Sequence, residues 1–339
     1  MGRLKQDPVA LTRQLVDIPS LTGKEKELAE WLMEGLKEEG WNCSRQMLDS
    51  QRFNLLALGD DPDVLFSTHM DTVPPFIASD EDDEDVKGRG SCDAKGQIAA
   101  MICAARRLVA EGHRDVGLLF LVGEETDSAG ARLAAQSGLS CSWIINGEPT
   151  DNHLVSAHKG ALGLRLTARG KTAHSGYPER GISAVETLLD VLQRLRQAEW
   201  PTHPLLGPSH LNIGVLRGGM APNVIPDQAQ AEVFFRCVVP CRRYLSRIDR
   251  LTSPLEVEVF TQSDPQHMHL EEGFPVKSVG FGTDIPYLKK IAAPLLYGPG
   301  SIFDAHTAQE KLNKKELLRG VDGLVALVQA LKRRSQPID

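Results

Sequence analysis

The stretch QIAAMICAARRLVAEGHRDVGLLFLVGEE, residues 97–125, carries the local pattern that decides the fold. Its first part has small and apolar residues at helical spacing and ends at Gly112, which predicts a helix over 97–112. The run at 116–122 is apolar throughout and short, which is typical of a strand buried on both faces. Because a similar run, VLFST at 64–68, precedes the helix, this segment predicts a strand–helix–strand unit with parallel strands.

Neighbouring segments extend this unit. The run SWIIN at 142–146 predicts a third buried strand. Near the N-terminus, Thr22 and Glu25 form a capping-box pattern ahead of an amphipathic segment at 24–40, which predicts a helix there. A second amphipathic segment at 313–334 predicts a C-terminal helix that packs back onto the first domain.

The middle of the chain has a different pattern. Alternating apolar and polar residues predict four half-exposed strands, and two amphipathic segments between them predict helices, in the order β-α-β-β-α-β. We therefore predict an α/β chain with a mostly parallel-sheet domain formed by residues 1–159 and 269–339. A two-layer α+β domain at 160–268 is inserted into it. The predicted strands are 161–170, 210–219, 228–238 and 255–262, and the predicted helices are 181–196 and 241–251.

Composition excludes several classes of function. The 339 residues carry a formal net charge of −7 without a basic cluster, which disfavours nucleic-acid binding. No apolar run approaches the ~20 residues that a membrane helix needs, and the N-terminus lacks a secretory pattern. Six cysteines without framework spacing indicate reduced thiols. We expect a cytoplasmic protein with no nucleic-acid partner and no membrane association.

Residues 80–85 form an unbroken run of six carboxylates, DEDDED. The run lacks the alternating ligand positions and the central glycine of a calcium-binding loop. Because like charges repel and extend a chain, we expect a solvated, mobile loop tip here.

Polar side chains follow each of the three predicted buried strands at the point where the strand ends. In an open α/β sheet, ligands bind at the carboxyl ends of the strands. Carboxylates that are crowded together repel one another unless cations neutralise them. Imidazole with carboxylates suits Zn²⁺ or a similar divalent cation, so the sequence predicts a metal site at this edge. The residues that can reach it are His69, Asp71, Asp93, Glu124, Glu125 and Glu148.

Six motifs occur in order along the chain: STHMDTVP, GRGSCDAKG, LVGEETDSAG, INGEPT, GKTAHSGYPERGISA and GGMAPNVIPD. In these motifs the chain resembles the di-zinc amidohydrolase and exopeptidase family that contains acetylornithine deacetylase, succinyl-diaminopimelate desuccinylase, aminoacylase and glutamate carboxypeptidase. The resemblance extends from about residue 8 to 330.

The resemblance implies a centre with two Zn²⁺ ions per chain, for which Co²⁺ can substitute. The two cations outweigh the charge of three carboxylate ligands, so the centre would acidify a bound water toward neutrality. In the family, the peptide bond after the bridging aspartate is cis, which here is Asp93–Ala94. The implied ligands are His69 and Glu148 for one ion, Glu125 and His306 for the other, and Asp93 as the bridge between them.

The resemblance also assigns the catalytic groups. Glu124 would be the general base that takes a proton from water and delivers it to the leaving nitrogen. Asp71 would accept the second N–H of His69 and fix its ring. The inserted domain resembles the family's lid and dimerisation domain. This similarity implies a homodimer in which the partner subunit's His174 supports the tetrahedral intermediate.

Four further residues match substrate-side positions of the family. Asn223 and Arg236 would contact the substrate's carboxylate and the oxyanion, and a guanidinium suits a carboxylate because it donates two parallel hydrogen bonds. Thr283 and Asp284 resemble a substrate-side loop, in which Asp284 could contact a cationic side chain.

The substrate expected from these residues is a small N-acyl amino acid or peptide. The preferred function is amide hydrolysis of an N-acyl amino acid, as in acetylornithine deacetylase. The close alternative is a di-zinc dipeptidase or carboxypeptidase. Two other readings are a single-metal hydrolase and an inactive relative that only binds a ligand. The presence of Glu124 and all five implied ligands disfavours the inactive relative.

Overall fold

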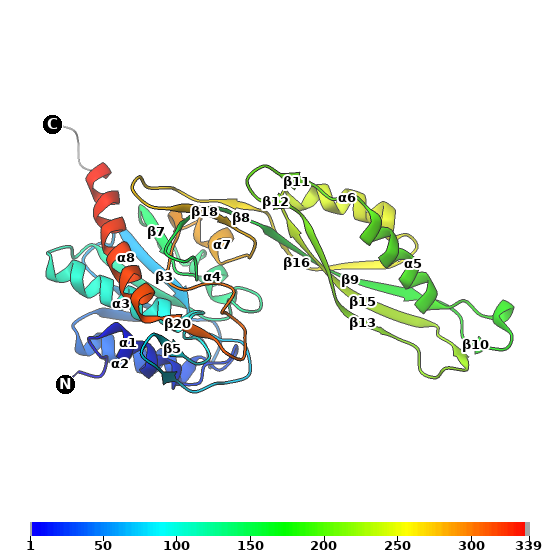
Figure 1. Cartoon of the computed structure of the whole chain (residues 1–339), viewed down its shortest axis with the longest axis horizontal. Helices are drawn as coiled ribbons and strands as arrows, with labels where there is room; N and C mark the ends of the chain where they lie inside the picture. Colours follow the sequence, from blue (N-terminus) through cyan, green and yellow to red (C-terminus); the bar gives the residue numbers. More distant parts are fainter. Residues whose placement is uncertain (1, 336–339) are drawn as a thin grey trace. The chain divides into compact units, whose positions relative to one another are not determined.

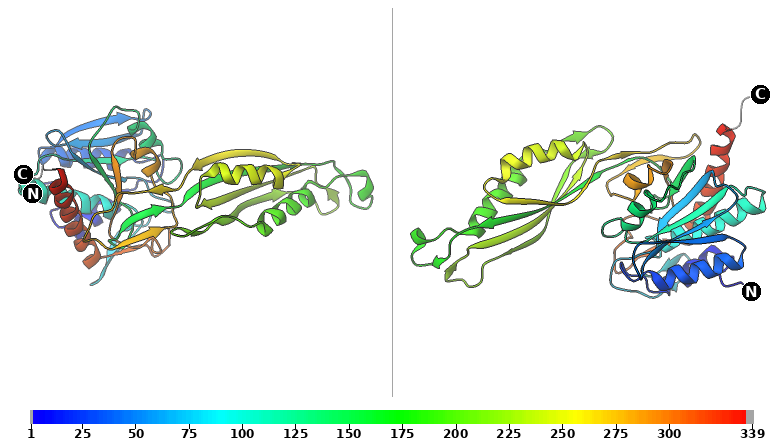
Figure 2. Two further views of the ribbon diagram at one scale, coloured as in Figure 1. Left: turned by 90° about the horizontal axis from the view of Figure 1, so that it is seen from above. Right: turned by 180° about the vertical axis from the view of Figure 1, so that it is seen from behind.

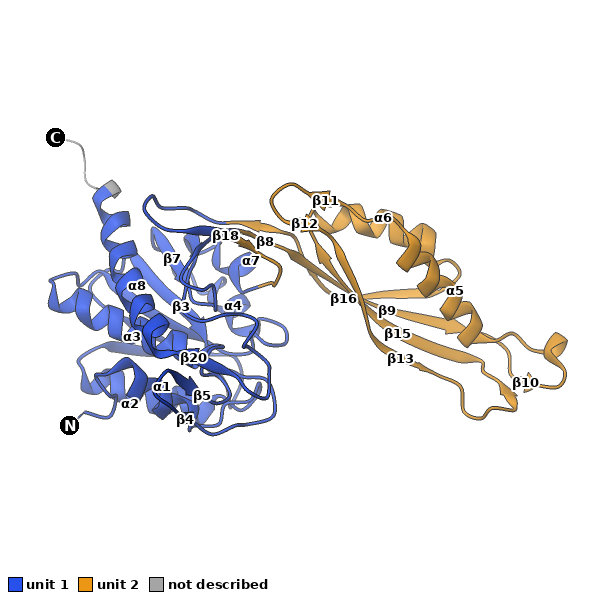
Figure 3. Cartoon of the chain, in the orientation of Figure 1, with its two compact units in different colours: residues 1–156, 268–277, 283–339 blue, residues 157–267, 278–282 orange. Residues whose placement is uncertain are grey.

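A computed structural model describes residues 2–335 of the chain. It divides the chain into two compact units (Figures 1 and 3). Unit 1 is formed by residues 1–156, 268–277 and 283–339, and unit 2 by residues 157–267 and 278–282. Among residues 2–335, no helix is both long and apolar enough to cross a membrane. All six cysteines are free thiols.

Unit 1 is built on a mixed, mostly parallel sheet of six strands in the order β1-β2-β6-β3-β7-β19. Strands β6, β3, β7 and β19 run parallel to one another, whereas β2 pairs antiparallel with β6 and β1 pairs antiparallel with β2 at one edge. The α/β fold class and the strand–helix–strand unit predicted from the sequence are therefore confirmed. The strands are β1 (Asn42–Met47), β2 (Phe53–Leu58), β3 (Val64–His69), β6 (Val116–Leu121), β7 (Trp143–Asn146) and β19 (Ala293–Leu296).

Helices cover both faces of this sheet (Figures 1 and 2). Phe66 and Phe120 point into the core on one face, and Leu65 and Leu119 point into the core on the other. Because both faces are buried, apolar residues occupy consecutive positions of the central strands, which explains their lack of alternation. One core contains residues of α1 (Pro8–Val16), α2 (Lys26–Glu38), α3 (Lys95–Ala110) and α8 (Lys314–Ser335), and the other contains residues of α4 (Ala129–Ala134) and α7 (Ile285–Leu288).

The predicted capping box at the start of α2 is wrong. Glu25 occupies the N-cap position without a side-chain capping bond, and its carboxylate is buried. The hydroxyl of Thr22 instead donates to Asp71 Oδ2 at 2.8 Å. A tertiary contact near the predicted metal site thus replaces the local one that the pattern indicated.

The acidic run is an ordered hairpin and not the mobile loop tip expected from its charge. Strands β4 (Asp80–Glu81) and β5 (Asp85–Lys87) pair with each other, and β5 also pairs with β20 (Lys311–Asn313). Lys87 pairs with Asp82 at 2.7 Å, and Lys311 pairs with Asp85 at 2.8 Å. A lysine within the hairpin and one from a distant segment therefore compensate the repulsion between the carboxylates.

Unit 2 has the predicted order β-α-β-β-α-β. Its four strands form an antiparallel sheet in the order β13-β15-β9-β16. Helices α5 and α6 pack on one face of this sheet over residues such as Leu164 and Phe235 (Figure 2). The elements are β9 (Gly160–Arg169), α5 (Ala184–Gln197), β13 (His210–Gly218), β15 (Gln228–Cys237), α6 (Cys241–Thr252) and β16 (Glu256–Ser263).

Short elements precede, separate and follow these along the chain. They are β8 (Leu154–His158), β10 (Ala173–His174), the 3-10 helix η1 (Pro178–Arg180), β11 (Thr202–His203), β12 (Gly207–Pro208), β14 (Val224–Ile225), β17 (Gln266–His267) and β18 (Val276–Val279).

Candidate metal centre

The ends of three neighbouring parallel strands of unit 1 place the predicted ligands at one edge of the sheet. His69 is the last residue of β3, and it lies opposite Leu121, the last residue of β6. Glu125 follows β6 by a few residues, and Glu148 follows β7 in the same way. The strand order β6-β3-β7 thus converts three separate sequence positions into one cluster.

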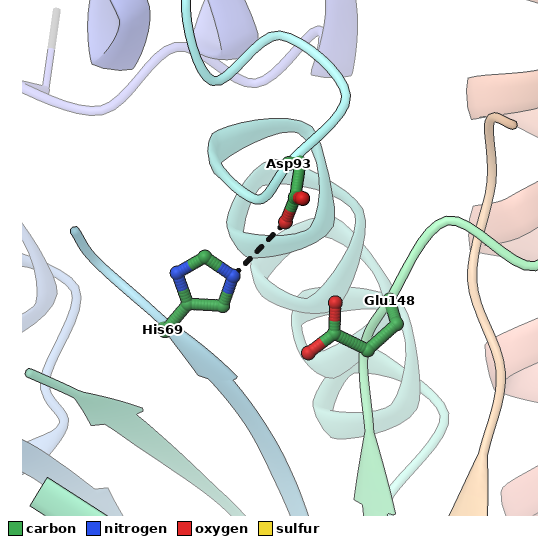
Figure 4. Close-up of side chains that lie close together, drawn as sticks. All are labelled: His69, Asp93 and Glu148. Atoms are coloured by element: carbon green, nitrogen blue, oxygen red, sulfur yellow. Dashed lines mark hydrogen bonds and ion pairs between the residues drawn. The ribbon is translucent and has the colours of Figure 1, made fainter. Parts of the chain in front are cut away.

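One group of possible ligands consists of His69, Asp93 and Glu148 (Figure 4). One ligand atom from each lies within 4.8 Å of the others, and His69 Nε2 is 3.0 Å from Asp93 Oδ1. The three residues are only 1%, 5% and 4% exposed. Asp93 precedes α3, and its peptide bond with Ala94 is cis, as the resemblance implies.

A second group consists of Asp93, Glu125 and His306. His306 lies in the loop between β19 and β20 and has a left-handed backbone (φ 61°). Its Nε2 is 2.9 Å from Glu125 Oε1 and 3.3 Å from Asp93 Oδ2. The two groups share Asp93, whose Oδ1 faces His69 and whose Oδ2 faces His306. This is the arrangement that a carboxylate bridging two cations requires.

The burial and charge of these side chains suit the binding of two cations. Glu148 Oε1 is buried and has no hydrogen-bond partner, which is costly for a carboxylate unless a cation compensates it. Burial first, and then the neighbouring carboxylates, raise the pKa values of Glu124 and Glu148 well above the ordinary range. Crowded acids that resist ionisation in this way are relieved by bound cations.

The carboxylates around His69 and His306 favour the protonated forms of both imidazoles. Hydrogen bonds with Asp93 and Glu125 raise the pKa of His306 to about 10. Burial opposes the protonation of His69, but its bonds with Asp71 and Asp93 outweigh burial and raise its pKa well above the ordinary value. A cation that binds here must therefore displace protons from imidazoles.

We predict that Co²⁺ affinity rises with pH. Because the pKa of His306 is raised to about 10, its ring is protonated below that pH and has no lone pair for a cation. Affinity should increase from about pH 6 to about pH 9, since fewer protons then remain to be displaced. Calorimetric titration with Co²⁺ in two buffers with different protonation enthalpies should detect the release of at least about one proton per chain near pH 7. Binding without proton release would contradict this picture.

Asp71 contacts more of the site than predicted. The Nδ1 atom of His69 lies 2.9 Å from the carbonyl oxygen of Asp71 and 3.4 Å from its carboxylate, so the backbone provides the shorter contact. The Asp71 carboxylate also accepts the backbone N–H groups of Glu124 and Glu125 at 3.1 and 3.2 Å. Together with the Thr22 hydroxyl, these bonds hold the strand end of β3 against the loop that follows β6.

The structure distinguishes the roles of Glu124 and Glu125, which the residues of the sequence alone leave open. Glu125 belongs to the second ligand group, whereas Glu124 belongs to neither. Burial, followed among the raising causes by the carboxylates of Asp284 and Glu125, raises the pKa of Glu124. A carboxyl group with a raised pKa beside a metal site has the properties of a proton-transfer group.

The predicted substrate-side residues lie in both units. His174 and Asn223 lie in exposed parts of unit 2, and Arg236 stacks over the Phe234 ring at 5.0 Å in the same unit. Thr283 and Asp284 are buried in unit 1, at the start of α7. Burial raises the pKa of Asp284 to about 6.

Sequence reasoning missed two groups that contact the ligand segments. The local pattern predicts a helix cap at Thr22, but its hydroxyl donates to Asp71. Glu310 was not singled out, although its carboxylate accepts the backbone N–H of Asp93 at 3.0 Å. Neither contact leaves a local signal, because the partners are 49 and 217 residues apart.

Comparisons with known proteins agree with this geometry. The profile described as Peptidase family M20/M25/M40 matches residues 65–330. A peptidase M20 domain-containing protein of Schizosaccharomyces pombe is 37% identical over 335 residues, which cover 94% of this chain and 84% of the relative. A probable carboxypeptidase of Aspergillus flavus is 35% identical over 370 residues, which cover 94% of this chain and 88% of the relative.

A solved structure resembles the chain as well. A tripeptidase of Staphylococcus aureus matches with a TM-score of 0.84 and covers 98% of this chain and 100% of its own. Its sequence identity is 20%, so this likeness concerns the fold alone.

Proposed function

Because the chain belongs to peptidase family M20/M25/M40 and is a metallohydrolase of that family, we propose that it is an exopeptidase of the carboxypeptidase or dipeptidase type. Its substrates would be small peptides with a free C-terminal carboxylate. The observation that best supports a metal-dependent reaction is that Asp93 belongs to both ligand groups.

The residues that would hold two divalent cations are the five named from the resemblance. His69 and Glu148 lie on one side of Asp93, and Glu125 and His306 lie on the other. When bound, the cations supply Lewis acidity, which polarises a carbonyl group and acidifies water. Imidazole and carboxylate ligands suit Zn²⁺, with Co²⁺ as a substitute.

Glu124 is proposed as the proton-transfer group. One oxygen of its carboxylate would take a proton from the attacking water. The same oxygen would then deliver that proton to the leaving nitrogen. Burial raises the pKa of Glu124, so its carboxylate is a stronger proton acceptor than that of an ordinary glutamate. Asp71 would keep Glu124 in place, because it accepts the backbone N–H of that residue.

Two related functions share this chemistry. A carboxypeptidase and an N-acyl amino acid deacylase both cleave an amide bond whose nitrogen belongs to an amino acid with a free carboxylate. They differ in the acyl group on the other side of that bond. The curated relative from Aspergillus flavus, a probable carboxypeptidase, favours the peptide substrate over the acetylornithine-like substrate preferred from the sequence.

Arg236 is the proposed partner of the substrate's carboxylate. It matches a substrate-side position of the family resemblance, and it lies on β15 of unit 2. A guanidinium pairs bidentately with a carboxylate, and this recognition would require a free C-terminus. Asn223, the partner subunit's His174 and dimerisation through unit 2 remain proposals that rest on the resemblance.

A panel of three substrates tests the proposed function. We expect an N-blocked dipeptide with a free C-terminus to be cleaved best in the presence of Zn²⁺ or Co²⁺. The same dipeptide with an amidated C-terminus should be cleaved about 10- to 100-fold less efficiently, because the charged hydrogen bonds to its carboxylate are lost. N-acetylornithine should also be a poorer substrate. Liquid chromatography of the released amino acid gives kcat/KM for each.

The variant Arg236→Ala provides the matched control for carboxylate recognition. It should lower kcat/KM for the N-blocked dipeptide with a free C-terminus. It should leave the already low kcat/KM for the amidated dipeptide unchanged. A chain that cleaves N-acetylornithine best would restore the deacylase interpretation. A chain that cleaves free and amidated dipeptides equally would overturn the carboxypeptidase proposal.

A further inference from the structure

The side chain of Glu310 accepts four hydrogen bonds from residues 89–93, the segment before α3 that carries Asp93 and is called the Asp93 loop below. This side chain is fully buried. Oε1 accepts the backbone N–H groups of Gly90, Cys92 and Asp93 at 2.9, 3.1 and 3.0 Å. Oε2 accepts a bond from Arg89 Nη1 at 2.6 Å. The carboxylate is thus the acceptor around which the loop preceding Asp93 is folded.

The backbone of Glu310 is tied to the same region. Its carbonyl oxygen accepts the N–H of Gly88 at 3.0 Å, next to the pairing of β5 with β20. Glu310 also follows His306 closely in the sequence, within the loop that leads into β20. One residue therefore connects the segment that carries His306 to the segment that carries Asp93.

The bonding of Glu310 distinguishes it from a metal ligand. An ionised carboxylate offers about four acceptor positions. Three N–H groups converge on Oε1 of Glu310 and Arg89 donates to Oε2, so both oxygens have protein partners, whereas Glu148 Oε1 has none. Glu310 is satisfied by the protein, and Glu148 is left for a cation. The two buried glutamates near Asp93 thus have different chemical roles.

We propose that Glu310 is a positioning residue for the metal centre, which sets the place of Asp93 relative to His306. This inference rests on the proposed function, because it requires that Asp93 bridges two cations. A bridging carboxylate must be held within about 0.5 Å of its productive geometry to serve both ions. Residues that orient metal ligands typically contribute about 10- to 100-fold to metal affinity.

The test compares Co²⁺ binding by the wild-type chain, Glu310→Ala, Glu310→Gln and the control Glu39→Gln. Titration of the metal-free proteins, followed by the visible absorption of Co²⁺, gives stoichiometry, affinity and ligand geometry. Glu39 pairs with Arg106 elsewhere in unit 1, so Glu39→Gln removes a comparable Arg–Glu ion pair away from the Asp93 loop. Circular dichroism establishes that each variant is folded.

We expect Glu310→Ala to weaken Co²⁺ binding about 10- to 100-fold and to change the absorption spectrum. Glu310→Gln keeps one oxygen for the N–H groups but turns an NH₂ group toward Arg89, so its loss should be smaller. Glu39→Gln should match the wild type. A merely structural Glu310 would lower thermal stability and leave the affinity and spectrum of the folded protein unchanged.

Wild-type affinity and spectrum in folded Glu310→Ala would overturn the proposal. If that variant does not fold, the same result in Glu310→Gln would overturn it. A wild-type chain that binds no Co²⁺ would refute the metal centre itself, and with it the proposed function. Failure of the positioning role is distinguishable from this, because the wild type then binds metal normally.

Discussion

Replacement of Glu124 by Gln should lower kcat by about 10²- to 10⁴-fold while the metal content stays at the wild-type value. Glutamine keeps the size of the side chain but cannot take a proton from water or deliver one to a leaving nitrogen. Because Glu124 belongs to neither ligand group, the substitution should leave metal binding intact. Steady-state kinetics on the N-blocked dipeptide with a free C-terminus give kcat, and elemental analysis of the same preparation gives the metal content.

The neighbouring residue supplies the matched control. Glu125→Gln should weaken metal binding, because Glu125 Oε1 lies 2.9 Å from His306 Nε2 in the second ligand group. The two variants therefore separate proton transfer from metal binding at adjacent positions. If Glu124→Gln remained fully active, or if it lost metal and Glu125→Gln did not, the assignment of the base would be wrong.

Replacement of Asp93 by Ala should remove both cations and abolish measurable turnover. Asp93 contributes one oxygen to each ligand group, so its loss disrupts both at once. Without Asp93, each group keeps only two of its three residues. Elemental analysis after extensive dialysis should fall from about two equivalents per chain to near zero. The metal-dependent increase in melting temperature should disappear with it.

A distant carboxylate on the same unit controls for the change of charge. Asp322 on α8 pairs with Arg107 and lies outside both ligand groups, so Asp322→Asn should keep two equivalents and full activity. An Asp93→Ala chain that retained one tightly bound equivalent and substantial activity would favour the single-metal hydrolase.

Continuous apolar runs made the core of unit 1 predictable. A strand buried on both faces is apolar over most of its length, so runs such as 64–68 and 116–122 mark central strands directly. Residues placed at the ends of such strands must converge when the strands are parallel neighbours. This geometry explains why His69 and Glu148 could be grouped before the sheet order was known.

Contacts between distant segments were not predictable in the same way. The acidic run was expected to be mobile because its own charges repel, yet Lys311 and the pairing with β20 order it. Thr22 fits a helix cap locally, but a buried carboxylate competes for its hydroxyl. Glu310 lies in no periodic pattern, and its bonds to residues 90–93 depend entirely on the tertiary fold.

The most direct test of the two-cation centre is anomalous X-ray scattering at the zinc absorption edge from a crystal grown with Zn²⁺. We predict two peaks per chain, one beside His69 and Glu148 and the other beside Glu125 and His306, with Asp93 between them. A single peak, or peaks away from Asp93, would contradict the account.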